Sequence, residues 1–138
     1  MSVGLLIISH GEVGQAIYEA ATSVLGSCPI RTHVVAMEFD YNRDDMLDEI
    51  QEKIIELDSG TGVLVLTDLY GATPSNIACL IENQNVAIVS GVNLPMLIRV
   101  LNYPNQPLAE LVSKAVSGGT EGIIHYKPIK DSHAANGS

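Results

Sequence analysis

The stretch VGLLIISHGEVG, residues 3–14, decides the fold. Residues 3–8 form an unbroken apolar run rich in branched side chains, which is typical of a strand buried on both faces inside a parallel sheet. The run stops just before His10 and Gly11, and a helical pattern begins near Gly14. This places His10 at the carboxyl end of a first strand, ahead of a helix. Open parallel sheets bind their ligands at this edge, so His10 is the first candidate for a functional residue.

Length and composition predict one compact domain. The chain has 138 residues, of which 46% are hydrophobic, and a mean hydropathy of +0.23. No apolar stretch approaches the roughly 20 residues that span a bilayer, and the N-terminus lacks the basic start of a signal peptide. The formal net charge of -9 argues against binding to nucleic acid or to an anionic membrane. We therefore expect a cytoplasmic protein without direct membrane insertion.

Cysteine and histidine spacing gives no indication of a metal site. Cys28 and Cys79 are far apart and lie in or beside apolar segments, so we expect two reduced, buried thiols. A metal bound at His10 would need a second ligand, but the remaining histidines lie at no ligand spacing from it: His33, His125 and His133. The sequence thus predicts no metal and no other cofactor.

Strands and helices alternate along the chain. The expected strands cover about residues 3–8, 30–37, 62–68 and 86–89, with a weakly alternating fifth at 122–127. The expected helices cover about residues 15–25, 43–57 and 73–82, a segment starting near 94, and 108–116, where Gly118-Gly119 is expected to end the last one. The alternation predicts an α/β, flavodoxin-like, doubly wound and mainly parallel sheet in the order 2-1-3-4. We expect residues 1–127 to form the domain and residues 128–138 a flexible tail.

The order 2-1-3-4 places the first and third strands side by side. His10 ends the first strand and Asp68 ends the third, so both side chains should reach one crevice. A carboxylate that binds one ring N–H leaves the other nitrogen free as a nucleophile. The Thr73-Pro74-Ser75 helix start adds free backbone N–H groups and hydroxyls that favour an anion. Together these parts suit phosphoryl transfer onto a histidine.

Each part also has an ordinary structural explanation. A lone histidine at a strand end is more often structural or merely exposed, Asp68 alone fits a loop or capping acid, and Thr73-Pro74 alone is a common helix cap. Only their joint placement at one predicted edge favours a functional site at His10.

Three stretches in this order resemble a known family: LIISHG (residues 6–11), GVLVLTDLYGATPSN (62–76) and VSGVNLPML (89–97). They are similar to the IIA component of the mannose-family phosphoenolpyruvate-dependent sugar phosphotransferase system, and the similarity covers residues 2–127. The third stretch is the most distinctive, because GVNLPM has no generic structural explanation.

The resemblance implies a phosphotransferase that carries phosphate on Nε2 of His10. The donor would be the phosphorylated carrier protein HPr, and the acceptor a histidine of a IIB partner that phosphorylates a sugar entering through membrane components. A purely regulatory use of the phosphorylation state is equally compatible with the sequence.

The resemblance also implies roles for further residues. Asp68 matches the acid that orients the active histidine, and the expected phosphate-binding residues are Gly71, Ala72, Thr73 and Ser75. Ala72 departs from the family, which often has a second glycine there. The expected partner-facing loop is Asn93, Leu94, Pro95 and Met96. The family is often a homodimer that exchanges a C-terminal strand, and residues 122–127 fit that role as an antiparallel strand.

Two other classes fit the sequence less well. Histidine phosphatases place an arginine directly before His-Gly and surround phosphate with more arginines, whereas this chain has Ser9 at that position and only three arginines, Arg31, Arg43 and Arg99. A flavodoxin-like receiver domain, which is a signalling module without enzymatic activity, needs acidic residues at the end of the first strand. Those are absent here.

Overall fold

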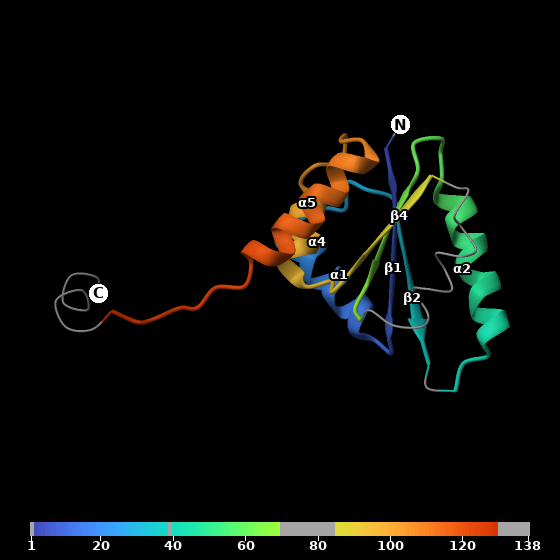
Figure 1. Cartoon of the computed structure of the whole chain (residues 1–138), viewed down its shortest axis with the longest axis horizontal. Helices are drawn as coiled ribbons and strands as arrows, with labels where there is room; N and C mark the ends of the chain where they lie inside the picture. The colour runs from blue at the N-terminus through green and yellow to red at the C-terminus, as the bar shows by residue number, and fades with distance from the viewer. Residues whose placement is uncertain (1, 39, 70–84, 130–138) are drawn as a thin grey trace.

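The computed structural model describes residues 2–38, 40–69 and 85–129 and contains a four-stranded sheet with helices on both faces (Figure 1). The strands are β1 (Gly4–His10), β2 (Thr32–Met37), β3 (Val63–Thr67) and β4 (Val86–Ser90). All three strand pairs are parallel, and the order is β2-β1-β3-β4. The predicted flavodoxin-like topology is therefore confirmed.

The described helices are α1 (Val13–Leu25), α2 (Arg43–Leu57), α4 (Leu94–Leu101) and α5 (Leu108–Glu121). Figure 1 shows α2 on one face of the sheet and the other three helices on the opposite face. Helix α2 has the predicted bounds, and its predicted cap is present, since the Asn42 side chain accepts a hydrogen bond from the Asp45 N–H at 3.0 Å. The helix expected at 73–82 lies outside the described residues.

The sheet separates two apolar clusters, and β1 contributes to both. Leu5 and Ile7 pack in the cluster beneath α1, α4 and α5, whereas Leu6 and Ile8 pack in the cluster beneath α2. Each of these four side chains is at most 1% exposed, and full burial of such a side chain stabilises the fold by about 1.5–3 kcal/mol. The unbroken apolar run thus makes β1 a central strand and brings its last residue, His10, to the carboxyl edge of the sheet.

The prediction that Gly118-Gly119 ends the last helix is wrong, because α5 continues through both glycines to Glu121. The two glycines instead allow α5 to approach α4 closely. A Cβ atom on Gly118 would lie 2.5 Å from Cβ of Arg99, and one on Gly119 would lie 2.8 Å from Cε of Met96. Close packing between helices, rather than termination, explains the glycine pair.

The prediction of a strand at 122–127 is also wrong for the single chain. Residues 123–129 have no regular structure and extend away from the globular body (Figure 1). Four apolar side chains of this segment are at least 63% exposed: Ile123, Ile124, Tyr126 and Ile129. A strand requires a neighbouring strand that shares backbone hydrogen bonds with it, and within the described part of the chain this segment pairs with no strand.

One cysteine differs from its expectation. Cys28 is a free thiol, as predicted, but it is exposed rather than buried. It lies in the loop between α1 and β2, where its Sγ contacts the backbone oxygen of Ile30 at 3.1 Å. Cys79 lies outside the described residues.

Candidate functional site

His10 is the last residue of β1, and its side chain is 60% exposed. The residues before it are buried in the sheet, while Gly11 after it turns the chain toward α1 with a positive φ of 52°. Because this backbone conformation is strained for residues with a side chain, glycine suits the position. The Gly11 N–H donates to the backbone oxygen of Met37 at the end of β2, at 2.9 Å. The histidine therefore stands at an open edge on an anchored backbone.

Asp68 directly follows β3 and lies against His10, 58 residues away in the sequence. The His10 backbone N–H donates to Oδ2 of Asp68 at 2.9 Å, and Nδ1 of the ring lies 3.1 Å from both carboxylate oxygens. The Leu69 N–H donates to Oδ1 at 2.9 Å. The structure thus brings together the two residues that the predicted strand order places at one edge.

The contact determines which ring nitrogen is free. An ionised carboxylate only accepts hydrogen bonds, so Nδ1 of His10 must carry the proton that it donates to Asp68. In the neutral ring, Nε2 then holds the lone pair, and the exposure of the side chain leaves it open to solvent and to partners. This is the arrangement expected of a nucleophilic imidazole whose tautomer is set by a neighbouring acid.

The environment favours the ionised form of Asp68. Burial of the carboxylate raises its pKa, but hydrogen bonds from the backbone and ring of His10, the charge of that ring and the Leu69 N–H together outweigh burial. The net effect is a pKa below the ordinary value for aspartate. Asp68 is therefore a carboxylate at neutral pH and can stabilise positive charge on the His10 ring.

Two buried hydroxyl groups beside this pair are not singled out by the sequence patterns above. Ser9 precedes His10 and is 0% exposed, while Thr67 precedes Asp68 and is 2% exposed. One sequence signal would have identified both residues: each is a hydroxyl residue at the end of an apolar strand, directly before a candidate site residue. Hydroxyl side chains are mostly exposed in proteins, so burial at such a position needs an explanation.

The other expected site residues divide into two groups. Those expected to bind phosphate lie outside the described residues: Gly71, Ala72, Thr73 and Ser75. In the expected partner-facing loop, Pro95 is exposed, and Asn93 and Leu94 are half-buried. Met96 is 4% exposed and packs in the core. That these four residues face a partner stays a prediction.

The structure gives the third motif a structural explanation that the sequence patterns did not provide. Asn93 caps α4, since its Oδ1 accepts from the Met96 N–H at 2.9 Å, and its Nδ2 donates to the backbone oxygen of Gly119 at 3.2 Å. Pro95 lies in the first turn of α4, where a missing N–H costs nothing. The motif therefore joins α4 to α5.

Two of the three arginines are not available to His10. Arg31 directly precedes β2 and so lies at the opposite edge of the sheet. The Arg99 guanidinium is bound by Ser117 at 3.3 Å and Glu121 at 3.2 Å. This arrangement does not support the arginine-rich phosphate site of a histidine phosphatase.

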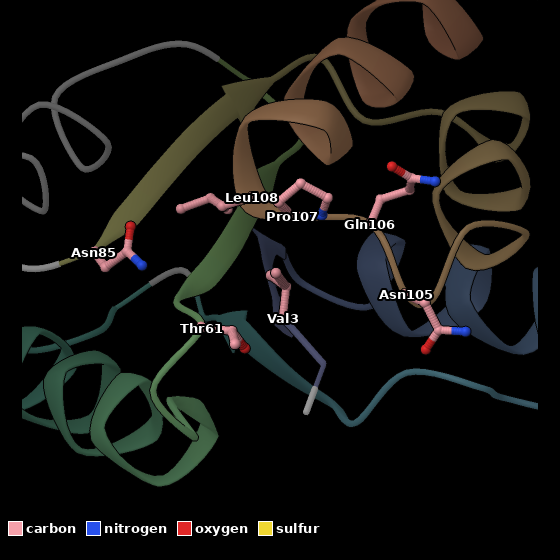
Figure 2. A pocket seen from close by; sticks show the side chains of 7 residues that line it. All are labelled: Val3, Thr61, Asn85, Asn105, Gln106, Pro107 and Leu108. Atoms are coloured by element: carbon pink, nitrogen blue, oxygen red, sulfur yellow. The ribbon is translucent and has the colours of Figure 1, made fainter.

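A cavity of about 480 Å³ lies at the amino ends of β1, β3 and β4, opposite the edge that carries His10 (Figure 2). Its polar side chains are uncharged: Thr61, Asn85, Asn105 and Gln106. Among the described residues, no group of three or more histidine, cysteine, aspartate or glutamate side chains could hold a metal ion. No helix in the described ranges is long and apolar enough to cross a membrane.

Known proteins with similar sequences identify the family of this chain. The chain is 28% identical to the mannose-specific EIIAB component of Escherichia coli K12 over an alignment of 138 residues, which covers 94% of this chain and 42% of the relative. It spans less than half of that relative. It is also 28% identical to the fructose-specific EIIA component of Bacillus subtilis, over 72% of this chain and 69% of the relative.

A solved structure supports the fold. The mannose/sorbose-specific IIA subunit from Enterococcus faecalis superposes with a TM-score of 0.82, covers 96% of this chain and 100% of its own, and is 22% identical. The family described as the PTS system fructose IIA component matches residues 4–116, which include β1 with His10 and the end of β3 with Asp68. This chain therefore belongs to the PTS fructose/mannose IIA component family.

Proposed function

We propose that this chain is a phosphoryl carrier of the phosphotransferase system that accepts phosphate on Nε2 of His10 from phospho-HPr and passes it to a IIB partner. The observation that carries the proposal is the contact of Asp68 with both Nδ1 and the backbone N–H of His10, at 3.1 and 2.9 Å. Membership of the IIA family supports the direction of transfer.

The proposed step is a displacement at phosphorus. The Nε2 lone pair of His10 attacks the phosphoryl group on the donor histidine, the bond from phosphorus to the donor nitrogen breaks, and its electron pair returns to the donor ring. The proton on Nδ1 of His10 stays in place throughout. As the new bond forms, the His10 ring becomes cationic, and the Asp68 carboxylate stabilises that charge. No cofactor takes part in this step.

The exposure of His10 supports transfer between proteins rather than turnover of a small molecule. A phosphorylated histidine on another protein must approach Nε2 in line, which requires open space around the ring. The His10 side chain is 60% exposed, which leaves such space around the ring.

Reconstituted phosphorylation tests the proposal. The purified chain is incubated with phosphoenolpyruvate, the first enzyme of the system and HPr, and phosphate incorporation is followed by intact mass. We expect one phosphoryl group that is lost in acid, and none in His10→Ala. His33, near the amino end of β2, supplies the control, since His33→Gln should be labelled like the wild type. Equal labelling of His10→Ala would refute the assignment, and so would release of inorganic phosphate from small phosphoesters without HPr.

We further propose that residues 122–127 mediate a homodimer by pairing with a second copy. The exposed apolar side chains of Ile123, Ile124 and Tyr126 support this proposal, because apolar residues exposed close together often mark an interaction surface. Light scattering of the full chain and of a chain ending at residue 121 tests it. A dimer that becomes a monomer on truncation is the expected result, and a monomer in both cases contradicts it.

The proposed acceptor is a IIB component, which lies on another chain or on a further domain. Labelled protein should lose its phosphate on addition of the cognate IIB domain and sugar if the role is transport. Retention of the phosphate, together with binding of a regulator that differs between the two phosphorylation states, would instead support regulation. Both roles use the same His10 chemistry in a cytoplasmic setting.

A further inference from the structure

Two hydroxyl residues, Ser9 and Thr67, are buried as whole residues in the described structure, and each lies at the end of a strand. Ser9 ends the buried part of β1 directly before His10, and Thr67 ends β3 directly before Asp68. In the strand pairing, Ile8 lies opposite Thr67, so Ser9 and Thr67 are diagonal neighbours on adjacent strands. Their side chains lie on opposite faces of the sheet, because Ser9 shares a face with Ile7 and Thr67 shares a face with Val65. Burying a hydroxyl group is unfavourable unless it forms hydrogen bonds. The partners of these two groups therefore indicate what they do.

The Ser9 hydroxyl connects the end of β1 to the start of α1. Its Oγ accepts a hydrogen bond from the Gly14 N–H at 2.7 Å and lies 3.4 Å from the backbone oxygen of Gly11. The His10 backbone lies inside this loop. Glu12 occupies the N-cap position of α1, but its side chain forms no capping hydrogen bond. Ser9 thus satisfies an N–H of the first helical turn from within the core.

The Thr67 hydroxyl makes the corresponding connection between β3 and β4. Its Oγ1 lies 2.9 Å from Oγ of Ser90 at the end of β4. The backbone oxygen of Thr67 accepts from the N–H groups of Gly91 and Val92 at 2.8 and 2.9 Å. Thr67 therefore fixes the end of β3, from which the Asp68 side chain extends, to the turn that follows β4.

We propose, on the basis of the phosphoryl-carrier function above, that Ser9 and Thr67 are positioning residues that hold the His10–Asp68 pair. The His10 ring is largely exposed, so the core restrains it little, and the orientation of Nε2 depends on its backbone and on Asp68. Both residues lie where strands pass into loops. Phosphoryl transfer depends mainly on positioning, and a misplacement of about 1 Å can lower a rate by about a hundredfold.

Thr67 offers a matched pair of substitutions that separates positioning from packing. Thr67→Val keeps the volume and removes the hydroxyl, whereas Thr67→Ser keeps the hydroxyl and removes a methyl group. If the hydroxyl positions Asp68, Thr67→Val should lower the single-turnover rate constant at saturating phospho-HPr by about tenfold. Thr67→Ser should stay within about twofold of the wild type, and the HPr concentration for half-saturation should change little in either variant.

Ser9 offers a second pair with the same logic. Ser9→Ala removes the acceptor for the Gly14 N–H, while Ser9→Thr retains a hydroxyl at the same carbon. We expect the rate constant to fall by about tenfold in Ser9→Ala and to recover at least in part in Ser9→Thr. Rates are compared only for variants that keep the wild-type circular dichroism spectrum. If a variant at one position does not fold, the pair of variants at the other position carries the comparison.

Nitrogen NMR of the unphosphorylated protein gives a readout independent of transfer. In protein with ¹⁵N-labelled histidine, His10 is assigned by the signal missing from His10→Gln. We expect the wild-type ring to be protonated on Nδ1, and Thr67→Val and Ser9→Ala to show an increased share of the Nε2-protonated form. Thr67→Ser should keep the wild-type spectrum.

The outcomes distinguish this inference from the function on which it rests. If the wild type takes no phosphate but the tautomer shifts as stated, the carrier function fails and the positioning role stands. If the wild type is phosphorylated while Thr67→Val and Ser9→Ala match it in rate constant and tautomer, the positioning role is refuted. A loss of rate in Thr67→Ser equal to that in Thr67→Val also refutes it, because packing would then explain both.

Discussion

The carboxylate of Asp68 binds His10 twice, once through the backbone N–H at 2.9 Å and once through Nδ1 of the ring at 3.1 Å. A single side chain therefore fixes both the position of the His10 backbone and the tautomer of its ring. The two contacts reach across neighbouring parallel strands, so both depend on how the ends of β1 and β3 are placed. Any change that moves the ends of β1 and β3 relative to one another alters both contacts together.

The role of Asp68 is tested by Asp68→Asn. The amide has the same shape as the carboxylate but only one acceptor oxygen and no charge. It therefore cannot accept as well from both the backbone N–H and Nδ1 of His10, and it does not stabilise a cationic ring. We expect phosphoryl transfer from HPr to slow by about 10- to 100-fold in a protein that still folds. Asp48→Asn, an exposed change on α2 with the same loss of charge, should leave the rate unchanged. A wild-type rate in Asp68→Asn would show that Asp68 is only structural.

The lowered pKa of Asp68 predicts how its contribution to stability depends on pH. A carboxyl group with a lower pKa in the folded than in the unfolded state binds fewer protons when folded. Its stabilising effect is therefore complete above the unfolded pKa and is lost as the pH falls through the folded pKa. We expect the difference in free energy of unfolding between the wild type and Asp68→Asn to be larger at about pH 5 than at about pH 3. Urea denaturation measures it, with Asp48→Asn as the control. A difference that grows toward acid would contradict the direction of the shift.

The sequence predicts the placement of His10 and Asp68 because that placement depends on strong, local signals. An apolar run without polar interruptions must lie inside the sheet, and the first polar residues after it must lie at its edge. The strand order then follows from right-handed connections and the flavodoxin-like pattern. Two residues 58 positions apart are brought together by these rules alone, before any contact between them is known.

Other features depend on contacts that no local pattern contains. A glycine pair such as Gly118-Gly119 predicts a helix end, but the same pair permits close packing, and only the position of α4 decides between them. The buried partners of Ser9 and Thr67 depend on loop geometry after the strands. A strand at 122–127 depends on a hydrogen-bonding neighbour. In each case tertiary contacts override the local preference.

The close contact of Ser9 with α1 predicts that Gly14→Ala is destabilising. Alanine normally stabilises an open helix by about 1 kcal/mol relative to glycine. Here its methyl group would lie 2.7 Å from Oγ of Ser9 and 2.9 Å from Cγ2 of Ile7. We expect the free energy of unfolding to fall by about 1–3 kcal/mol. The exposed Ser23 in the same helix gives the control, since Ser23→Ala should change stability by no more than about 0.5 kcal/mol. A stabilised Gly14→Ala protein would show that this contact relaxes without cost.

The two hydrogen bonds of Asn93 predict a stability effect that can be separated from partner binding. Asn93→Ala removes the helix cap, which accepts from the Met96 N–H, and the hydrogen bond to the Gly119 backbone oxygen. We therefore expect the free energy of unfolding, measured by urea denaturation, to fall by about 1–2 kcal/mol. Asn93→Asp keeps the cap but loses the donor to Gly119, and should lie between Asn93→Ala and the wild type. Asn102→Ala, a change at an exposed asparagine, is the control for the effect on the free energy of unfolding. If Asn93 acts only by joining α4 to α5, the folded Asn93→Asp protein should bind HPr as the wild type does. Weaker HPr binding with unchanged stability would instead place Asn93 in the partner interface.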